Sequence, residues 1–237
     1  MTTASIDVDQ LDWPKITAQL DIEGYALLPG SINPERAAMA RSQINECRAT
    51  CRVALADVKL GQGDLFYFDD ALPPHIDTWR HDLYRRLAPI ANEWNDRLRL
   101  VHRYPDTLDA FLAQNRTVGQ TRPLSHLSRL RTGDYLALHR RGEGALVFPL
   151  QVVALLSETG RHFTGGEFVM TEQRPRMQSR PMVVPLKLGD MAIITTSQRP
   201  LKGTKGYYRA NLKHAISRVR SGERVGMELS FHDAPAA

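Results

Sequence analysis

The stretch MVVPLKLGDMAIIT, residues 182–195, decides the fold class of this chain. It contains two short apolar runs, separated by the turn residues Gly189 and Asp190. Runs of this length that are rich in Val and Ile and bounded by turn residues are typical of strands rather than helices. We therefore predict strands over Met182–Leu186 and Met191–Thr195, joined through a tight corner.

The same pattern fills the carboxyl-terminal half of the chain. Further strands are predicted over Tyr135–His139, Phe148–Ser157, Glu167–Thr171, Ala215–Val219 and Val225–Phe231, with turns at residues 164–166 and 221–222. Short strands at this spacing favour a two-sheet sandwich or a double-sheet jelly roll.

The amino-terminal half has helical periodicity instead. Asn33 is a suitable N-cap and Pro34 a suitable first residue for a helix that we predict to run through Arg52. A second long helix is predicted over Asp77–Leu100, with a kink at Pro89. Residues 61–74 between the two helices are rich in turn signals and predict a loop. The whole chain is thus expected to be mainly β with amino-terminal helices, in the α+β class.

Length and composition narrow the function classes. A chain of 237 residues with 42% hydrophobic and 24% charged residues can bury a core without disulfides, and it is not fibrous or disordered. The longest nearly apolar run, residues 145–156, is too short to span a membrane, which takes about 20 residues. Residues 1–10 lack the features of a secretory signal. With only Cys47 and Cys51, read as free thiols, we expect a cytoplasmic protein.

The net charge of +5 is concentrated in one region. Residues 171–224 carry 12 Lys or Arg against 3 Asp or Glu. Such a basic segment either contacts phosphates or forms solvated sheet edges. Nucleic acid is therefore one candidate partner, beside a small-molecule or peptide substrate.

Two histidines at predicted strand ends are the first candidates for chemistry. His139 closes one strand and His214, 75 residues later, precedes another. A jelly roll brings distant strand ends together, and neutral imidazole is the commonest metal ligand, so the two can share one ion. Arg224 follows His214 by ten residues and is predicted on the next strand, where a buried guanidinium needs a carboxylate partner.

This arrangement resembles the iron(II)- and 2-oxoglutarate-dependent dioxygenases, in a bacterial group distantly related to prolyl hydroxylases and alkylated-nucleic-acid repair dioxygenases. The similar stretches are residues 23–35, 119–123, 148–153, 165–169, 171–179 and 231–234. The resemblance implies a double-stranded β-helix (jelly roll) in a single domain, residues 1–237. Within it, residues 11–118 form a helical support with an opening strand, and residues 119–234 form the core.

The resemblance also implies cofactors and site residues. His139 and His214 would hold Fe(II), and Arg224 would bind the far carboxylate of 2-oxoglutarate. Related hydroxylases often place a Tyr nine or ten residues before the first His to help hold 2-oxoglutarate, but here those positions are Leu130 and Arg129. Tyr135 is the nearest phenol and takes its place as the candidate.

One position departs from the family pattern. The residue two after the first His is the acidic iron ligand in the family, and here it is Arg141. A guanidinium has no acceptor and stays protonated, so Arg141 cannot ligate iron. Three alternatives remain open: Glu143 moves in as a surrogate ligand, the two histidines form a site with an open position, or Arg141 itself fills the metal's space.

Two functions follow from these alternatives. The first is a 2-oxoglutarate-dependent oxygenase of the hydroxylase type. The second is a catalytically inactive or altered family member, which binds a ligand or partner without oxidising it.

Overall fold

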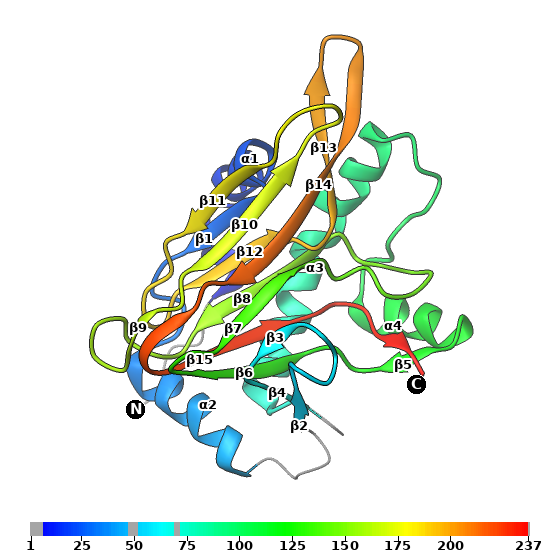
Figure 1. Cartoon of the computed structure of the whole chain (residues 1–237). Helices are drawn as coiled ribbons and strands as arrows, with labels where there is room; N and C mark the ends of the chain where they lie inside the picture. Colours follow the sequence, from blue (N-terminus) through cyan, green and yellow to red (C-terminus); the bar gives the residue numbers. More distant parts are fainter. Residues whose placement is uncertain (1–6, 47–51, 69–71, 237) are drawn as a thin grey trace.

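The computed structural model describes residues 7–46, 52–68 and 72–236. In this part of the chain the helices precede residue 118, and most strands follow it (Figure 1). The helices are η1 (Val8–Gln10), α1 (Trp13–Glu23), α2 (Pro34–Glu46), α3 (Pro74–Arg97) and α4 (Leu108–Thr117). The strands are β1 (Tyr25–Leu28), β2 (Arg52–Ala54), β3 (Gly61–Gln62), β4 (Asp64–Tyr67), β5 (Gln120–Arg122), β6 (His126–Arg131), β7 (Tyr135–His139), β8 (Leu150–Leu155), β9 (Phe163–Gly165), β10 (Phe168–Gln173), β11 (Arg180–Val184), β12 (Met191–Thr195), β13 (Gln198–Gly203), β14 (Gly206–Ile216), β15 (Val219–Leu229) and β16 (Ala234–Pro235).

Two antiparallel sheets face each other. The larger has the order β1-β12-β8-β15-β6-β4-β2, with β9 paired to β15. The smaller has the order β11-β10-β14-β7-β3, with β13 paired to β14. The predicted mainly β jelly roll with amino-terminal helices is confirmed. Among the helices of the described residues, none is long and apolar enough to cross a membrane.

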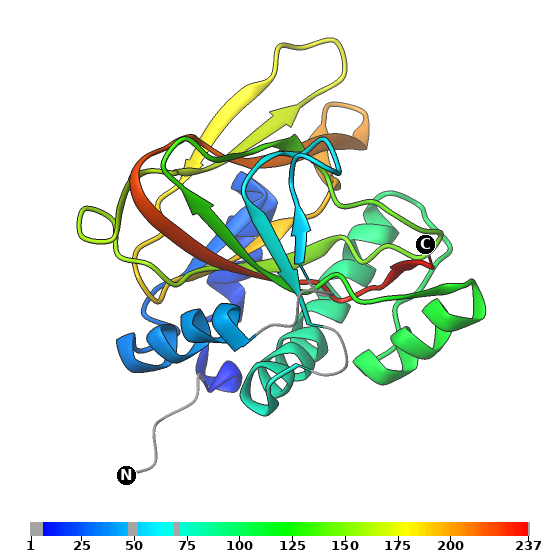
Figure 2. The same ribbon diagram turned by 60° about the horizontal axis from the view of Figure 1, so that its bottom comes forward.

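The larger sheet is buried on both faces. Every residue of β8 is buried, as expected of a central strand between two apolar layers. Val152 and Ala154 pack into the core shared with the helices, whereas Val153 and Leu155 face the other sheet. Figure 2 shows α2, α3 and α4 gathered on one side of the strands. The space between the sheets is therefore an enclosed interior, and the site described below lies in it.

The two predicted helices begin near their predicted residues. The Asn33 side chain accepts a hydrogen bond from the Arg36 backbone N–H at 2.9 Å, so Asn33 caps α2 as expected. The end at Arg52 was wrong, because Arg52 already lies in β2 and pairs with Phe66. Cys47 and Cys51 lie outside the described residues. α3 begins at Pro74 and continues past Pro89 to Arg97.

The predicted loop over residues 61–74 was also wrong. Its first part forms β3 and β4, and the apolar residues Leu65 and Phe66 are buried. β4 pairs with β6 along four residues, so it extends the larger sheet. Glycine signals outweighed this short apolar run in the sequence, although Gly61 and Gly63 only supply positive φ angles at the ends of the two strands.

Candidate functional site

His139 and His214 lie side by side in the interior. They are register partners on β7 and β14, and their ring centroids are 4.3 Å apart. The register shifts in this pair of strands: the step from Leu136 to His139 on β7 matches the step from His214 to Ile216 on β14. This bulge turns both Leu136 and His139 inward, despite their odd spacing. The two histidines that the sequence singled out are thus brought together.

Two histidines have a fixed tautomer. Nδ1 of His139 lies 2.9 Å from the Ala137 carbonyl oxygen, and Nδ1 of His126, on β6, lies 2.9 Å from the Leu124 carbonyl oxygen. Because a carbonyl only accepts, both Nδ1 atoms carry the proton and both Nε2 atoms present a lone pair. Neither Nε2 has a hydrogen-bond partner. Backbone-anchored imidazoles of this kind are typical of metal ligands.

Arg141 lies inside the same cluster. It is only 4% exposed, and its Nε is 3.8 Å from Glu228 Oε2. Its backbone N–H donates to the Thr196 carbonyl oxygen at 3.2 Å, which fixes the chain just after β7. Its Nη2 has no hydrogen-bond partner. The residue at the family's acidic position therefore introduces a buried cation.

Like His126, Glu228 on β15 is a member of the cluster that the sequence did not predict. Its carboxylate lies 3.8 Å from His126 Nε2 and 4.0 Å from His214 Nε2, and neither oxygen accepts a hydrogen bond. Burial opposes its ionisation, but the charge that His126 carries when protonated and the Arg141 guanidinium outweigh burial and lower the pKa of Glu228 to about 2. The sequence did contain one indication of Glu228. It is a single acid in an otherwise apolar strand, and it lies an even number of residues after Arg224, so that both side chains are on the same face.

Arg224 is buried on β15, where the sequence placed it. Its Nε donates to the Gly166 carbonyl oxygen at 2.9 Å, and its Nη1 has no hydrogen-bond partner. Burial lowers its pKa to about 10, so the guanidinium remains charged at neutral pH. Glu228 lies four residues further along the same strand, and side chains at this spacing share a face.

The other two predicted site residues lie elsewhere. Glu143 is exposed, and its carboxylate accepts a hydrogen bond from the Gly142 backbone N–H at 3.2 Å. Tyr135 is half-buried, and the Arg218 guanidinium lies over its ring at 5.8 Å. Neither side chain is part of the buried cluster.

The donor atoms of the cluster fit a divalent transition metal in kind. Imidazole nitrogens and a carboxylate are ligands that iron accepts. Nε2 of His126, Nε2 of His139 and both Glu228 oxygens are buried without partners, whereas Nε2 of His214 lies 3.4 Å from the Gln151 side-chain nitrogen. Across the described residues, however, no group of three or more His, Cys, Asp or Glu side chains is arranged to hold an ion. The separations of 3.8 and 4.0 Å exceed the roughly 3 Å between neighbouring ligands that each bind at about 2.1 Å. The side chains must therefore draw together by about an ångström to bind iron.

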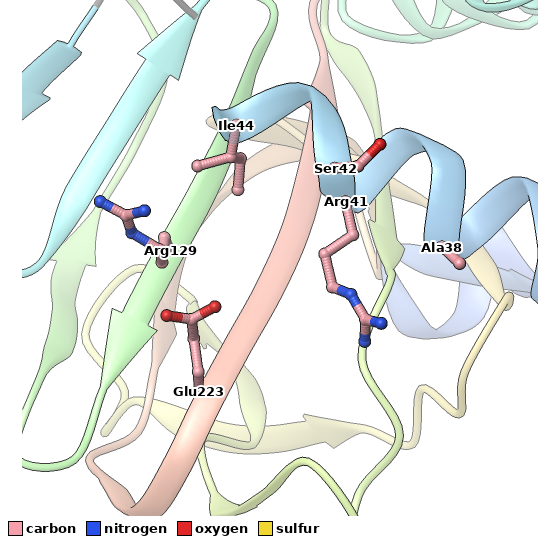
Figure 3. A pocket seen from close by; sticks show the side chains of 6 residues that line it. All are labelled: Ala38, Arg41, Ser42, Ile44, Arg129 and Glu223. Carbon is pink, nitrogen blue, oxygen red and sulfur yellow. The ribbon is translucent and has the colours of Figure 1, made fainter. Parts of the chain in front are cut away.

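A separate pocket lies outside the barrel, between α2 and the larger sheet (Figure 3). Its volume is about 260 Å³, and it is lined by Ala38, Arg41, Ser42, Ile44, Arg129 and Glu223. The Arg41 guanidinium lies against the His162 ring, with Nη1 at 3.4 Å from both ring nitrogens. This pocket shares no residue with the histidine cluster.

Comparison with known proteins places the chain in a family. Residues 63–234 match the family described as "Oxygenase, catalysing oxidative methylation of damaged DNA". Two uncharacterized proteins of Mycobacterium tuberculosis, MT2286 and Rv2227 from two strains, are each 43% identical to it over 159 residues, which cover 67% of this chain and 68% of the relative.

Solved structures share the fold. A prolyl-4-hydroxylase from Pseudomonas putida has a TM-score of 0.52 at 13% identity and covers 94% of this chain and 100% of its own. An oxidoreductase of the 2OG-Fe(II) oxygenase family from Burkholderia pseudomallei has a TM-score of 0.51 at 17% identity, with 95% and 94% coverage. Family and fold together indicate an oxygenase-type function, and such enzymes generally depend on Fe(II) and 2-oxoglutarate. The chain therefore belongs to the oxygenase family that its residues 63–234 match, and it has the jelly-roll fold of the 2-oxoglutarate- and iron-dependent oxygenases.

Proposed function

We propose that this chain is a 2-oxoglutarate-dependent, non-haem iron oxygenase of the hydroxylase type. The observation that carries the proposal is the buried contact of His139 with His214, with the His139 Nε2 lone pair unpartnered and its Nδ1 held by a backbone carbonyl. These two side chains would hold the iron. Iron, when bound, would supply the activation of oxygen.

Arg224 would bind the far carboxylate of 2-oxoglutarate. Its Nε is already engaged by Gly166, which fixes the guanidinium, while Nη1 remains free to donate. A fixed, buried guanidinium favours a charged, hydrogen-bonded carboxylate partner.

For the substrate, two classes have support. A similar solved structure is a prolyl hydroxylase of Trichoplax adhaerens in complex with a peptide fragment, which favours a peptide or small molecule. The family description and the basic region 171–224 favour nucleic acid. Nucleic-acid binding would weaken steeply with added salt, because phosphate contacts release counterions. Binding that does not change with salt, or no binding, would remove this class.

Arg141 favours a second candidate function. A permanent cation among the histidines opposes a divalent ion, since like unit charges 4 Å apart repel by about 4 kcal/mol at an effective dielectric of 20. In that case the barrel binds a carboxylate ligand or a partner without oxidising it.

An anaerobic titration decides between the two candidates. Metal-free protein receives ferrous iron and then 2-oxoglutarate, and the visible charge-transfer band of the chelated 2-oxo acid is followed. The oxygenase proposal predicts a saturable band, and Arg224→Gln should raise the 2-oxoglutarate concentration at half-saturation at least tenfold while iron binding persists. Absence of a band from folded protein would overturn the oxygenase proposal and leave the second candidate.

A further inference from the structure

The substitution at position 141 leaves the iron site without its usual acid, but the interior contains another. We propose that Glu228 on β15 replaces the missing acidic ligand, and that His126 on β6 joins His139 and His214 as a metal ligand. This inference rests on the proposed oxygenase function. The acidic ligand would then come from β15 in the larger sheet, rather than from the segment that follows β7 in the smaller sheet.

Glu228 is distinguished from the buried acids Asp64, Glu172 and Asp190 by its lack of hydrogen-bond partners. Asp64 and Glu172 accept hydrogen bonds from arginines, and Asp190 accepts from two backbone N–H groups. Both oxygens of Glu228 are buried without any hydrogen bond. A buried ionised carboxylate in this condition is costly unless a cation completes it.

The imidazoles around Glu228 do not donate hydrogen bonds to its carboxylate. His126 presents its Nε2 lone pair to Glu228 Oε1 at 3.8 Å, because its Nδ1 proton is used by the Leu124 carbonyl. Nε2 of His214 lies 4.0 Å from the other carboxylate oxygen and 3.4 Å from the Gln151 side-chain nitrogen. A lone pair facing a carboxylate is repelled by it, and a metal ion between them turns that repulsion into coordination.

Glu228 also balances the positive charge of Arg141. The Arg141 Nε lies 3.8 Å from Glu228 Oε2, so the guanidinium and the carboxylate sum to zero charge. A divalent ion therefore enters a cluster in which the fixed cation is already offset. Glu143, the acid that the sequence suggested for this task, is exposed on the following loop.

Metal binding by the full-length, metal-stripped protein tests the inference without reference to turnover. Co(II) serves as the probe, because its visible spectrum reports ligand number, and calorimetry gives its affinity. We expect one Co(II) per chain. Glu228→Gln, which keeps the size of the side chain, should weaken Co(II) binding at least 100-fold, and His126→Gln about tenfold. Glu143→Gln is the matched control and should leave the affinity unchanged.

Glu228→Gln also leaves Arg141 without its counter-charge, so loss of folding has to be separated from loss of a ligand. A comparison of Arg141→Gln with Arg141→Gln/Glu228→Gln separates the two effects, because the double variant contains neither charge of the pair and thermal unfolding shows whether each variant is folded. The single variant should bind Co(II) at least as tightly as the natural chain, and the double variant at least 100-fold more weakly.

The outcomes separate this inference from the proposed function. Equal Co(II) affinity of the Arg141→Gln single and double variants would overturn the role of Glu228. If the 2-oxoglutarate band also appears, the oxygenase proposal survives. A natural chain that binds no Co(II), together with an Arg141→Asp variant that does, would overturn both and show that the Arg141–Glu228 pair closes the metal position.

Discussion

Arg199 is fully buried and joins three elements of the fold. Its Nη1 and Nη2 donate to the carbonyl oxygens of Asp21 and Ile22, at 2.5 and 3.0 Å, near the end of α1. Its Nε donates to Glu172 on β10 at 2.9 Å. One guanidinium thus satisfies helix-end carbonyls and a buried carboxylate together, which is the fork geometry that only arginine supplies.

Arg199→Gln should therefore destabilise the protein strongly. The variant leaves Glu172 as a buried charge with a single remaining ion pair, to Arg174, and a broken buried pair costs about 3–5 kcal/mol of unfolding free energy. Urea denaturation measures the change. Arg174→Gln is the control: Arg174 contacts the same carboxylate but is 35% exposed in its side chain, so we expect a loss below about 1 kcal/mol. Equal losses in the two variants would contradict this account.

Of the four proposed metal ligands, the sequence predicted two. His139 and His214 were recognisable because each stands at a strand end, at a spacing that a jelly roll brings together. Glu228 was not, because its neighbours His126 and Arg141 are distant in the sequence. Their meeting depends on the register of β15 with β6, where Glu228 pairs with His126, and register between distant strands is not readable from spacing alone.

The corner between β11 and β12 shows how a turn residue is required by its surroundings. Gly189 has φ of 81°, and its carbonyl oxygen accepts from the Ile32 backbone N–H at 2.8 Å. A Cβ added at Gly189 would lie 2.0 Å from the Ile32 carbonyl oxygen. The corner is thus packed directly against the segment that precedes α2.

Gly189→Ala should lower the free energy of unfolding by more than the positive φ angle alone would cause. We expect a loss of at least about 3 kcal/mol of unfolding free energy, because backbone strain and a steric clash add. Gly133 provides the matched control: its φ is 93°, and an added Cβ would meet no atom within 4 Å. Gly133→Ala should lose only about 1–2 kcal/mol. Thermal and urea unfolding of both variants measure the difference, and equal losses would show that the corner relaxes around the methyl group.

Elements with an apolar pattern were predicted better than polar ones. β12 has the predicted bounds, Met191–Thr195, and all five of its residues are buried. The hairpin of β13 and β14 was missed over residues 198–213, where Lys, Arg and Tyr interrupt any alternation. This hairpin projects beyond the sheets in Figure 1, so much of it has no apolar face to reveal it. Its pairing depends on the backbone ladder rather than on burial.

For the whole molecule, the buried histidines couple folding to pH. Burial is the main cause that lowers the pKa of His126 to about 4, and that of His214 and His232 to about 3. In the unfolded chain each pKa is near 6.5. Above about pH 7 all three are neutral in both states and contribute no pH dependence. Below about pH 6.5 the unfolded chain binds protons that the folded protein refuses, so the free energy of unfolding decreases as the pH falls.

The three most strongly shifted histidines make the main contribution to the pH dependence, and burial lowers the pKa of His75, His102 and His139 in the same direction. Each of the three most strongly shifted groups contributes about 1.4 kcal/mol per pH unit, so the free energy of unfolding of metal-free protein should fall by up to about 4 kcal/mol per unit between roughly pH 6 and 4. The resulting fall of up to about 8 kcal/mol over that window is comparable with a total stability of about 5–15 kcal/mol. Urea denaturation at a series of pH values from 8 to 5 measures the slope. His232→Gln removes one of these groups and should reduce the slope by up to about 1.4 kcal/mol per pH unit. A stability that stays constant from pH 7 to 5 would mean that the folded interior accepts these protons, and that its histidines are not held neutral.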